Sequence, residues 1–158
     1  MIETRELRIG NIILFQGEPV KVMGIHTGSV LLDGVMRPSA NGIGIEYNPI
    51  SAQEDTLVPL PLNDFLLETM GMGRFKSYSG VTQHQYHPGG SIYSIMSDEE
   101  GYFIGMEKED GPVHITPRHF YFFHQLQNLH FSQYGEEINI GEEDVKRAWR
   151  TAKNLGKV

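Results

Sequence analysis

Histidine is the most frequent candidate for chemistry in this chain, which has seven histidines and no cysteine among its 158 residues. Without thiolates, a zinc or iron site must draw three or four ligands from imidazoles and carboxylates that converge in space. His84 and His87 share one polar segment, and four further histidines fall between residues 114 and 130. A metal-dependent enzyme that uses His84, His87 and one of the later histidines is therefore one alternative interpretation.

The spacing of the later histidines argues against a site made from them alone. On a helix, His119 and His124 differ by about 140° around the axis, and His124 and His130 by about 240°. These imidazoles would point to different faces, and the chain contains no His-Glu-x-x-His pair. Our primary prediction therefore includes no metal and no cofactor.

Other catalytic signatures are absent from the sequence. It has no Gly-x-Ser-x-Gly motif, and Gly71-Met-Gly73 is too short for a dinucleotide-binding loop. Acid–base chemistry needs carboxylates in unlike, partly buried environments. The acidic clusters at 98–100 and 142–144 fall in a predicted turn and at a predicted helix start, where water would solvate them. The sequence therefore contains no motif that supports an enzymatic function.

Composition narrows the functional classes further. The formal net charge is −7, from 13 Lys and Arg against 20 Asp and Glu. Phosphate backbones are bound by clustered cations, and the longest basic run is Lys146-Arg147. A nucleic-acid-binding module is therefore our third hypothesis. No run approaches the ~18–20 apolar residues that span a bilayer, and residues 1–6 lack the basic and apolar regions of a signal peptide. We expect no membrane association and a cytoplasmic location.

The sequence centres on a predicted helix over residues 117–134. Thr116 is a good N-cap, and Pro117 suits the first helical position, where no N–H donor is needed. Gly135 supplies the left-handed residue that commonly ends a helix. Leu126 and Leu129 recur at helical spacing within it. We expect this segment to be the core helix.

The N-terminal part is predicted to be all β. Apolar runs of about five residues alternate with glycine-containing breaks, which is typical of hairpins. The expected strands are Ile12–Gln16, Val20–Ile25, Ser29–Leu32 and Ile43–Tyr47, with turns at Asp33-Gly34 and Asn41-Gly42. We predict an SH3-like small β-barrel over residues 1–50, with an irregular meander as the alternative. The prolines of the segment that follows predict an extended connector over residues 51–61.

Residues 62–158 are predicted to form an α+β domain, in which an antiparallel sheet packs against the central helix and a C-terminal helix. Asn63 would cap a short helix, Asp64–Met70. The expected strands are Arg74–Tyr78, Ser91–Met96, Tyr102–Lys108, Val113–Thr116 and Glu137–Ile140, with a long polar loop over Ser79–Gly90. A terminal helix over residues 142–155 carries one apolar stripe: Val145, Ala148, Trp149, Ala152 and Leu155.

Three blocks carry a resemblance to a known family. They are Glu6–Asn11 (Glu-Leu-Arg-Ile-Gly-Asn), Pro61–Leu67, and His124–Leu129 (His-Gln-Leu-Gln-Asn-Leu). In these the chain resembles small uncharacterised proteins encoded by phages and mobile elements of Bacteroides-type gut bacteria. Asn63 stands where a threonine cap is common, and the helix after Gly141 extends beyond many relatives. The resemblance implies a phage or mobile-element origin and the cytoplasm of the host cell, and it brings no catalytic residues.

These observations favour a non-enzymatic accessory protein that acts by protein binding or self-association. The candidate partner-binding residues are the polar loop and the exposed aromatics: Gln83, His84, Tyr86, His87, Tyr121 and Trp149. A polar patch on the central helix, His124, Gln125 and Asn128, has two interpretations. Its amides either satisfy backbone groups of the neighbouring sheet or form a recognition surface.

Overall fold

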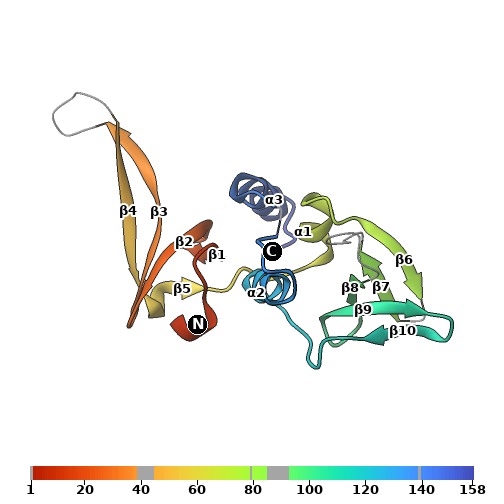
Figure 1. Cartoon of the computed structure of the whole chain (residues 1–158). Coiled ribbons are helices and arrows are strands. Elements are labelled where there is room, and N and C mark those ends of the chain that lie inside the picture. Colours follow the sequence, from red (N-terminus) through yellow and green to blue (C-terminus); the bar gives the residue numbers. More distant parts are fainter. Residues whose placement is uncertain (1, 39–44, 79, 85–92, 139) are drawn as a thin grey trace. The chain divides into compact units, whose positions relative to one another are not determined.

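Two five-stranded antiparallel sheets and three α-helices make up the described part of the chain (Figure 1). The computed structural model describes residues 2–38, 45–78, 80–84, 93–138 and 140–158. The predicted α+β class is confirmed. Contacts divide the chain into unit 1, Met1–Leu60 with Phe123–Glu142, and unit 2, Pro61–Phe122 with Glu143–Val158.

The sheet of unit 1 has the strand order β4-β3-β2-β1-β5. Its strands are β1 Ile12–Phe15, β2 Glu18–His26, β3 Ser29–Pro38, β4 Ile45–Gln53 and β5 Leu57–Val58. One of the two sheets of the chain is a curled half-barrel. Closure into an SH3-like barrel stays a prediction.

The module extends further along the chain than its predicted end at residue 50. Strand β4 continues to Gln53, and β5 pairs antiparallel with β1, so residues 51–53 and 57–58 of the predicted connector 51–61 belong to the sheet. Asp33-Gly34 is not a turn between strands, because β3 continues through it with a register shift. A Cβ at Gly34 would lie 1.8 Å from the Asn48 carbonyl oxygen, so glycine is needed for a close backbone approach. Asn41-Gly42 lies outside the described residues.

Helix α2, Phe123–Tyr134, belongs to unit 1 and not to the C-terminal sheet as predicted. The reason is a pair of amide contacts. Gln127 Oε1 accepts the Ile12 N–H at 2.8 Å, and Gln127 Nε2 donates to the Gly10 carbonyl at 3.2 Å. The core beside them consists of buried apolar side chains: Ile2, Leu7, Ile13, Val22, Val30, Leu32, Ala52 and Leu57.

The predicted start of this helix at residue 117 is wrong, whereas its end at Tyr134 is correct. Thr116 does not cap the helix, because its Oγ1 accepts the Ile104 N–H at 3.1 Å. The Phe120 N–H donates to the Tyr102 carbonyl at 2.7 Å, and Phe120 accepts the Tyr102 N–H at 3.2 Å. Pairing with the sheet of unit 2 thus satisfies backbone groups that a longer helix would have satisfied internally.

The sheet of unit 2 is a meander with the order β10-β9-β8-β7-β6. Its strands are β6 Arg74–Tyr78, β7 Val81–His84, β8 Tyr93–Ser97, β9 Tyr102–Lys108 and β10 Gly111–His114. Strand β7 lies within the predicted loop Ser79–Gly90, which corrects that assignment. Helix α1, Asp64–Thr69, has the predicted cap, since Asn63 accepts the Leu66 N–H at 2.8 Å.

The C-terminal helix α3, Glu142–Asn154, has nearly the predicted bounds. Four of its five stripe residues are buried, and Leu155 is exposed. The strand predicted over Glu137–Ile140 does not form in the described residues there, where the Ile140 N–H donates to the Ile138 carbonyl at 2.8 Å. None of the helices in the described ranges has the length and apolarity needed to span a bilayer.

Candidate metal centre

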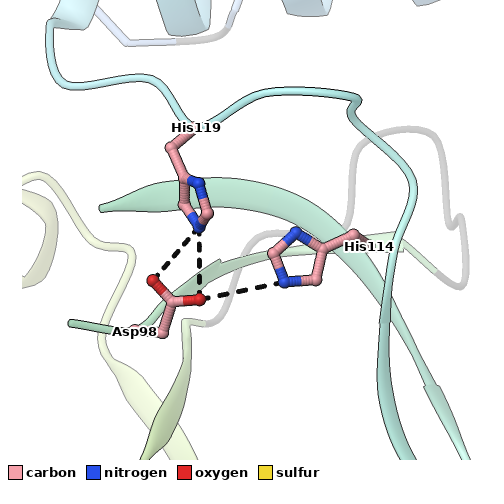
Figure 2. Close-up of side chains that lie close together, drawn as sticks. All are labelled: Asp98, His114 and His119. Atoms are coloured by element: carbon pink, nitrogen blue, oxygen red, sulfur yellow. Dashed lines mark hydrogen bonds and ion pairs between the residues drawn. The ribbon is translucent and has the colours of Figure 1, made fainter. Parts of the chain in front are cut away.

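Asp98, His114 and His119 converge in unit 2 (Figure 2). Each offers one ligand atom, and the three ligand atoms lie within 4.8 Å of one another. Asp98 follows β8, His114 ends β10, and His119 lies between β10 and α2. Within the described residues this is the one His, Asp and Glu group with such spacing.

The turn between β8 and β9 fixes the carboxylate of Asp98. Its Oδ1 accepts the N–H groups of Glu100 at 2.9 Å and Gly101 at 3.1 Å. Gly101 has a φ of 145°, and a Cβ there would lie 2.7 Å from the Tyr121 ring and 3.3 Å from His119 Cβ. Glycine therefore lets the segment that carries His119 pass close to this turn.

His119 is brought to the carboxylate by the same backbone pairing that delays the start of α2. Because Phe120 is paired with Tyr102, residue 119 lies beside the β8–β9 turn. His119 Nε2 lies 3.1 Å from Asp98 Oδ1, and its Nδ1 lies 3.6 Å from Glu100 Oε2. A carboxylate thus faces each ring nitrogen, which is the arrangement that orients many metal-binding imidazoles.

His114 is positioned by stacking on Phe103, with 3.6 Å between the ring centroids and 4° between the ring planes. In the β9–β10 register His114 is paired with Gly105. Because Gly105 has no side chain, the His114 ring can lie over the Phe103 ring. A Cβ at Gly105 would lie 2.9 Å from the Phe103 ring. His114 Nε2 lies 3.8 Å from Asp98 Oδ2, and His119 packs edge-on against His114 with centroids 5.2 Å apart.

The charge of the site suits a cation. Burial alone would raise the pKa of Asp98, but hydrogen bonds from His119 and from the N–H groups of Glu100 and Gly101 outweigh it and hold the pKa below its usual value. Asp98 is therefore ionised at neutral pH, as a metal ligand must be. The side chain of His114 is 46% exposed, against 15% for His119 and 19% for Asp98. Ions can therefore reach the site from the His114 side.

Two imidazole nitrogens and one carboxylate oxygen form a ligand set for zinc and related transition metals. Around a tetrahedral zinc ion, ligand atoms lie about 3.3 Å apart, given bonds of about 2.0–2.2 Å. No two of the present ligand atoms are more than 4.8 Å apart, so coordination would require them to approach by at most about 1.5 Å. The residues therefore fit a metal ion, and these three ligands would leave a fourth coordination position of a tetrahedral ion for water or a substrate.

No family model, curated protein or solved structure matches this chain. The resemblance to proteins of phages and mobile elements stays a prediction.

The histidine proposed from sequence as a metal ligand lies elsewhere. His84 is fully buried in β7, and His87 and Tyr86 lie outside the described residues. His84 Nε2 is 3.4 Å from Asp64 Oδ1 and 3.4 Å from Ser97 Oγ. Desolvation lowers the pKa of His84, although Asp64 opposes the shift. Both partners face the same nitrogen, so this is not a serine–histidine–aspartate relay, which uses both nitrogens.

Of the described residues predicted to bind a partner, only Tyr121 is exposed, at 50%. Gln83 is buried in β7 and donates to Ser94 Oγ at 2.9 Å. Trp149 lies on the buried face of α3, with 7% exposure. Gln83, His84 and Trp149 therefore serve the interior of the protein, and a partner surface would have to use Tyr121.

In the polar helix patch, Asn128 satisfies a backbone group, but this group lies in the 3-10 turn Thr4–Glu6 and not in the sheet as the first interpretation expects. Asn128 Nδ2 donates to the Glu6 carbonyl at 2.7 Å, and its Oδ1 accepts from Asn11 at 2.9 Å. His124 is buried in α2, where desolvation lowers its pKa to about 4, and Gln125 is half-buried beside it. Gln127, between these residues, makes the most buried contact and was not among the predicted residues.

The histidines between residues 114 and 130 and the acidic cluster at 98–100 are visible in the sequence, but nothing in it predicts that they meet. The feature that links them is the pair of short turns in the β8–β9–β10 meander. These turns place the end of β8 and the end of β10 on either side of the start of β9. His119 joins them only through the backbone pairing of Phe120, for which the sequence carries no local signature.

Proposed function

We propose that this protein binds one divalent transition-metal ion, of the zinc class, through Asp98, His114 and His119. The observation that carries the proposal is the convergence of both imidazole Nε2 atoms on one ionised carboxylate, at 3.1 Å and 3.8 Å. Folding alone does not require this arrangement, because His114 is half-exposed and would be solvated without a partner.

The ligand types select the ion. Mg²⁺ and Ca²⁺ prefer sites made of oxygen atoms, whereas imidazole suits Zn²⁺ and its neighbours. Structural zinc sites are usually closed by four protein ligands, and sites with three protein ligands keep a position for water or a substrate. At such a position zinc lowers the pKa of bound water to about 7 and so supplies hydroxide near neutral pH. The site is therefore of the open type.

Native mass spectrometry of the untagged protein with added Zn²⁺ tests this function. The wild type should gain the mass of one zinc ion, and the variant His114→Gln with His119→Gln should gain none. His26→Gln is a matched control, because His26 is exposed at the end of β2 in unit 1. Absence of zinc from the wild type, or equal uptake by the double variant, would contradict the proposal.

Self-association is a second candidate function, favoured by the 50% exposure of Tyr121. Its ring contacts Phe122 at 6.4 Å between centroids in a T-shaped arrangement, which supports an aromatic surface. Sedimentation of wild type and Tyr121→Ala would test this. A smaller assembly in the variant supports the function, and a monomeric wild type rules it out.

A further inference from the structure

A cavity of about 240 Å³ opens in unit 2 beside the metal centre. Its polar lining consists of two carboxylates and three hydroxyl groups: Asp64, Asp98, Thr82, Ser97 and Tyr102. Asp98 belongs to both the cavity and the metal centre. A molecule in this cavity therefore touches a residue that also holds the ion.

Contacts with neighbouring side chains hold the polar groups at the acidic end of the cavity wall. The Tyr102 hydroxyl donates to Asp64 Oδ1 at 2.9 Å, and Arg74 forms an ion pair with Asp64. Arg74 is not among the described residues that line the cavity, and its ion pair offsets part of the charge of Asp64. Ser97 Oγ is held 3.4 Å from the fully buried His84. These contacts fix the acceptor and hydroxyl groups before any ligand arrives.

The lining selects against anions and for hydroxyl donors. No lysine or arginine belongs to its described residues, so a phosphate or carboxylate would find no cation there except the metal. Carboxylates accept hydrogen bonds from hydroxyl groups, and the hydroxyls of Thr82 and Ser97 can both donate and accept. Together with the ion pair from Arg74, a bound divalent ion would more than offset the charges of Asp98 and Asp64, which removes the attraction for an organic cation.

The size of the cavity limits the ligand. At about 240 Å³ it is smaller than the roughly 300–1,000 Å³ that drug-sized ligands occupy. We propose that it binds a small neutral polyol of monosaccharide size, whose hydroxyl groups donate to Asp64 and Asp98. This inference rests on the proposed metal function, because the charge balance of the cavity includes the ion.

Saturation-transfer NMR with myo-inositol, on the untagged protein loaded with zinc, tests the proposal. Wild type should transfer saturation to inositol, and inorganic phosphate should show no ³¹P line broadening. Thr82→Val is nearly isosteric and removes one hydroxyl from the lining, so it should weaken inositol binding about 2- to 10-fold. Thr151→Val makes the same change on the exposed face of α3 and should have no effect. Ser97→Ala provides a second lining variant if Thr82→Val does not fold.

The outcomes separate the two proposals. If zinc binds by mass but inositol receives no saturation, or if Thr82→Val and Ser97→Ala both bind it as wild type does, the cavity proposal is overturned and the metal function stands. Broadening of phosphate in place of inositol binding also overturns it. If the wild type takes up no zinc, the metal function fails, and the same mass spectrum shows this independently of the NMR result.

Discussion

The two units place polar side chains in opposite ways. In unit 1, Gln127 and Asn128 of α2 bond to backbone groups of Gly10, Ile12 and Glu6. In unit 2, the polar groups at the end of the meander face one another. A polar side chain whose partners are main-chain groups is explained by folding. Ionisable side chains that converge at an accessible surface are better explained by a ligand.

The two arrangements also differ in how much they stabilise the folded protein. An unpaired amide in a protein interior lowers the free energy of unfolding by about 1–3 kcal/mol. Gln127 therefore stabilises unit 1, because its side chain bonds to the backbone groups around it. The contacts of Asp98 with the neighbouring imidazoles are partly exposed, and such contacts contribute little stability. Changes in unit 1 should therefore alter stability, and changes at the metal centre should alter metal affinity.

Loss of a metal ligand should produce the largest effect. His119→Ala should weaken zinc binding by more than about 100-fold, because loss of an outer partner alone costs about 10- to 100-fold. Isothermal titration of zinc into the untagged protein measures this. The free energy of unfolding without metal should change little. An unchanged affinity would remove His119 from the site.

The buried histidine of unit 1 should make stability depend on pH. The pKa of His124 is about 4 in the folded protein because of desolvation, against about 6.5 when unfolded. Below pH 6.5 the unfolded chain therefore binds a proton that the folded chain does not. Stability should fall as the pH drops from about 6.5 to about 4, by up to about 3 kcal/mol.

Urea unfolding at several pH values, with a chelator present, measures this loss in wild type and in His124→Phe. The variant should lose clearly less stability over the same pH range, since it has no imidazole at this position. Equal pH dependence in both proteins would show that His124 is not the group responsible.

Removal of the amide of Gln127 should destabilise unit 1 without touching the metal centre. Gln127→Leu leaves the Ile12 N–H without its partner, so the free energy of unfolding should fall by about 1–3 kcal/mol. Gln133→Leu is the matched control, because Gln133 is exposed on the same helix. Thermal or urea unfolding compares the two. A change in zinc affinity in Gln127→Leu would break the proposed separation between the units.

The outer carboxylate of the metal centre should have the smallest effect. Glu100 Oε2 lies 3.6 Å from His119 Nδ1, and its side chain is 75% exposed, so Glu100→Gln should weaken zinc binding by about tenfold. Glu99→Gln changes the neighbouring exposed residue in the same way and should leave the affinity unchanged. Equal affinities in the two variants would mean that Glu100 does not position His119.

Local signals were enough to predict much of the fold. The Asn63 cap, the apolar stripe of α3 and the end of α2 before Gly135 follow from residue types at fixed spacing. The start of α2 could not be predicted, because Thr116 and Phe120 bond to residues of β9. No residue near the expected helix start indicates this pairing. Tertiary pairing there overrode good capping residues.

The candidate site was predicted less well than the fold. The expected metal ligand His84 proved to be a buried strand residue, because β7 formed inside a segment whose polar residues and glycines indicated a loop. Strand register decides which histidines meet, and a single sequence does not specify register in a polar meander. His114 and His119 could be named as candidates, but their convergence on Asp98 required the structure.

The most direct test is a long-range ¹H–¹⁵N correlation spectrum of the imidazole groups, recorded as zinc is added to the untagged protein. It reports on each of the seven histidines separately. We predict that the Nε2 resonances of His114 and His119 shift to values typical of metal-bound nitrogen, while those of His26, His84 and His124 stay in place. Shifts centred on His84, or no change at any histidine, would contradict the metal centre.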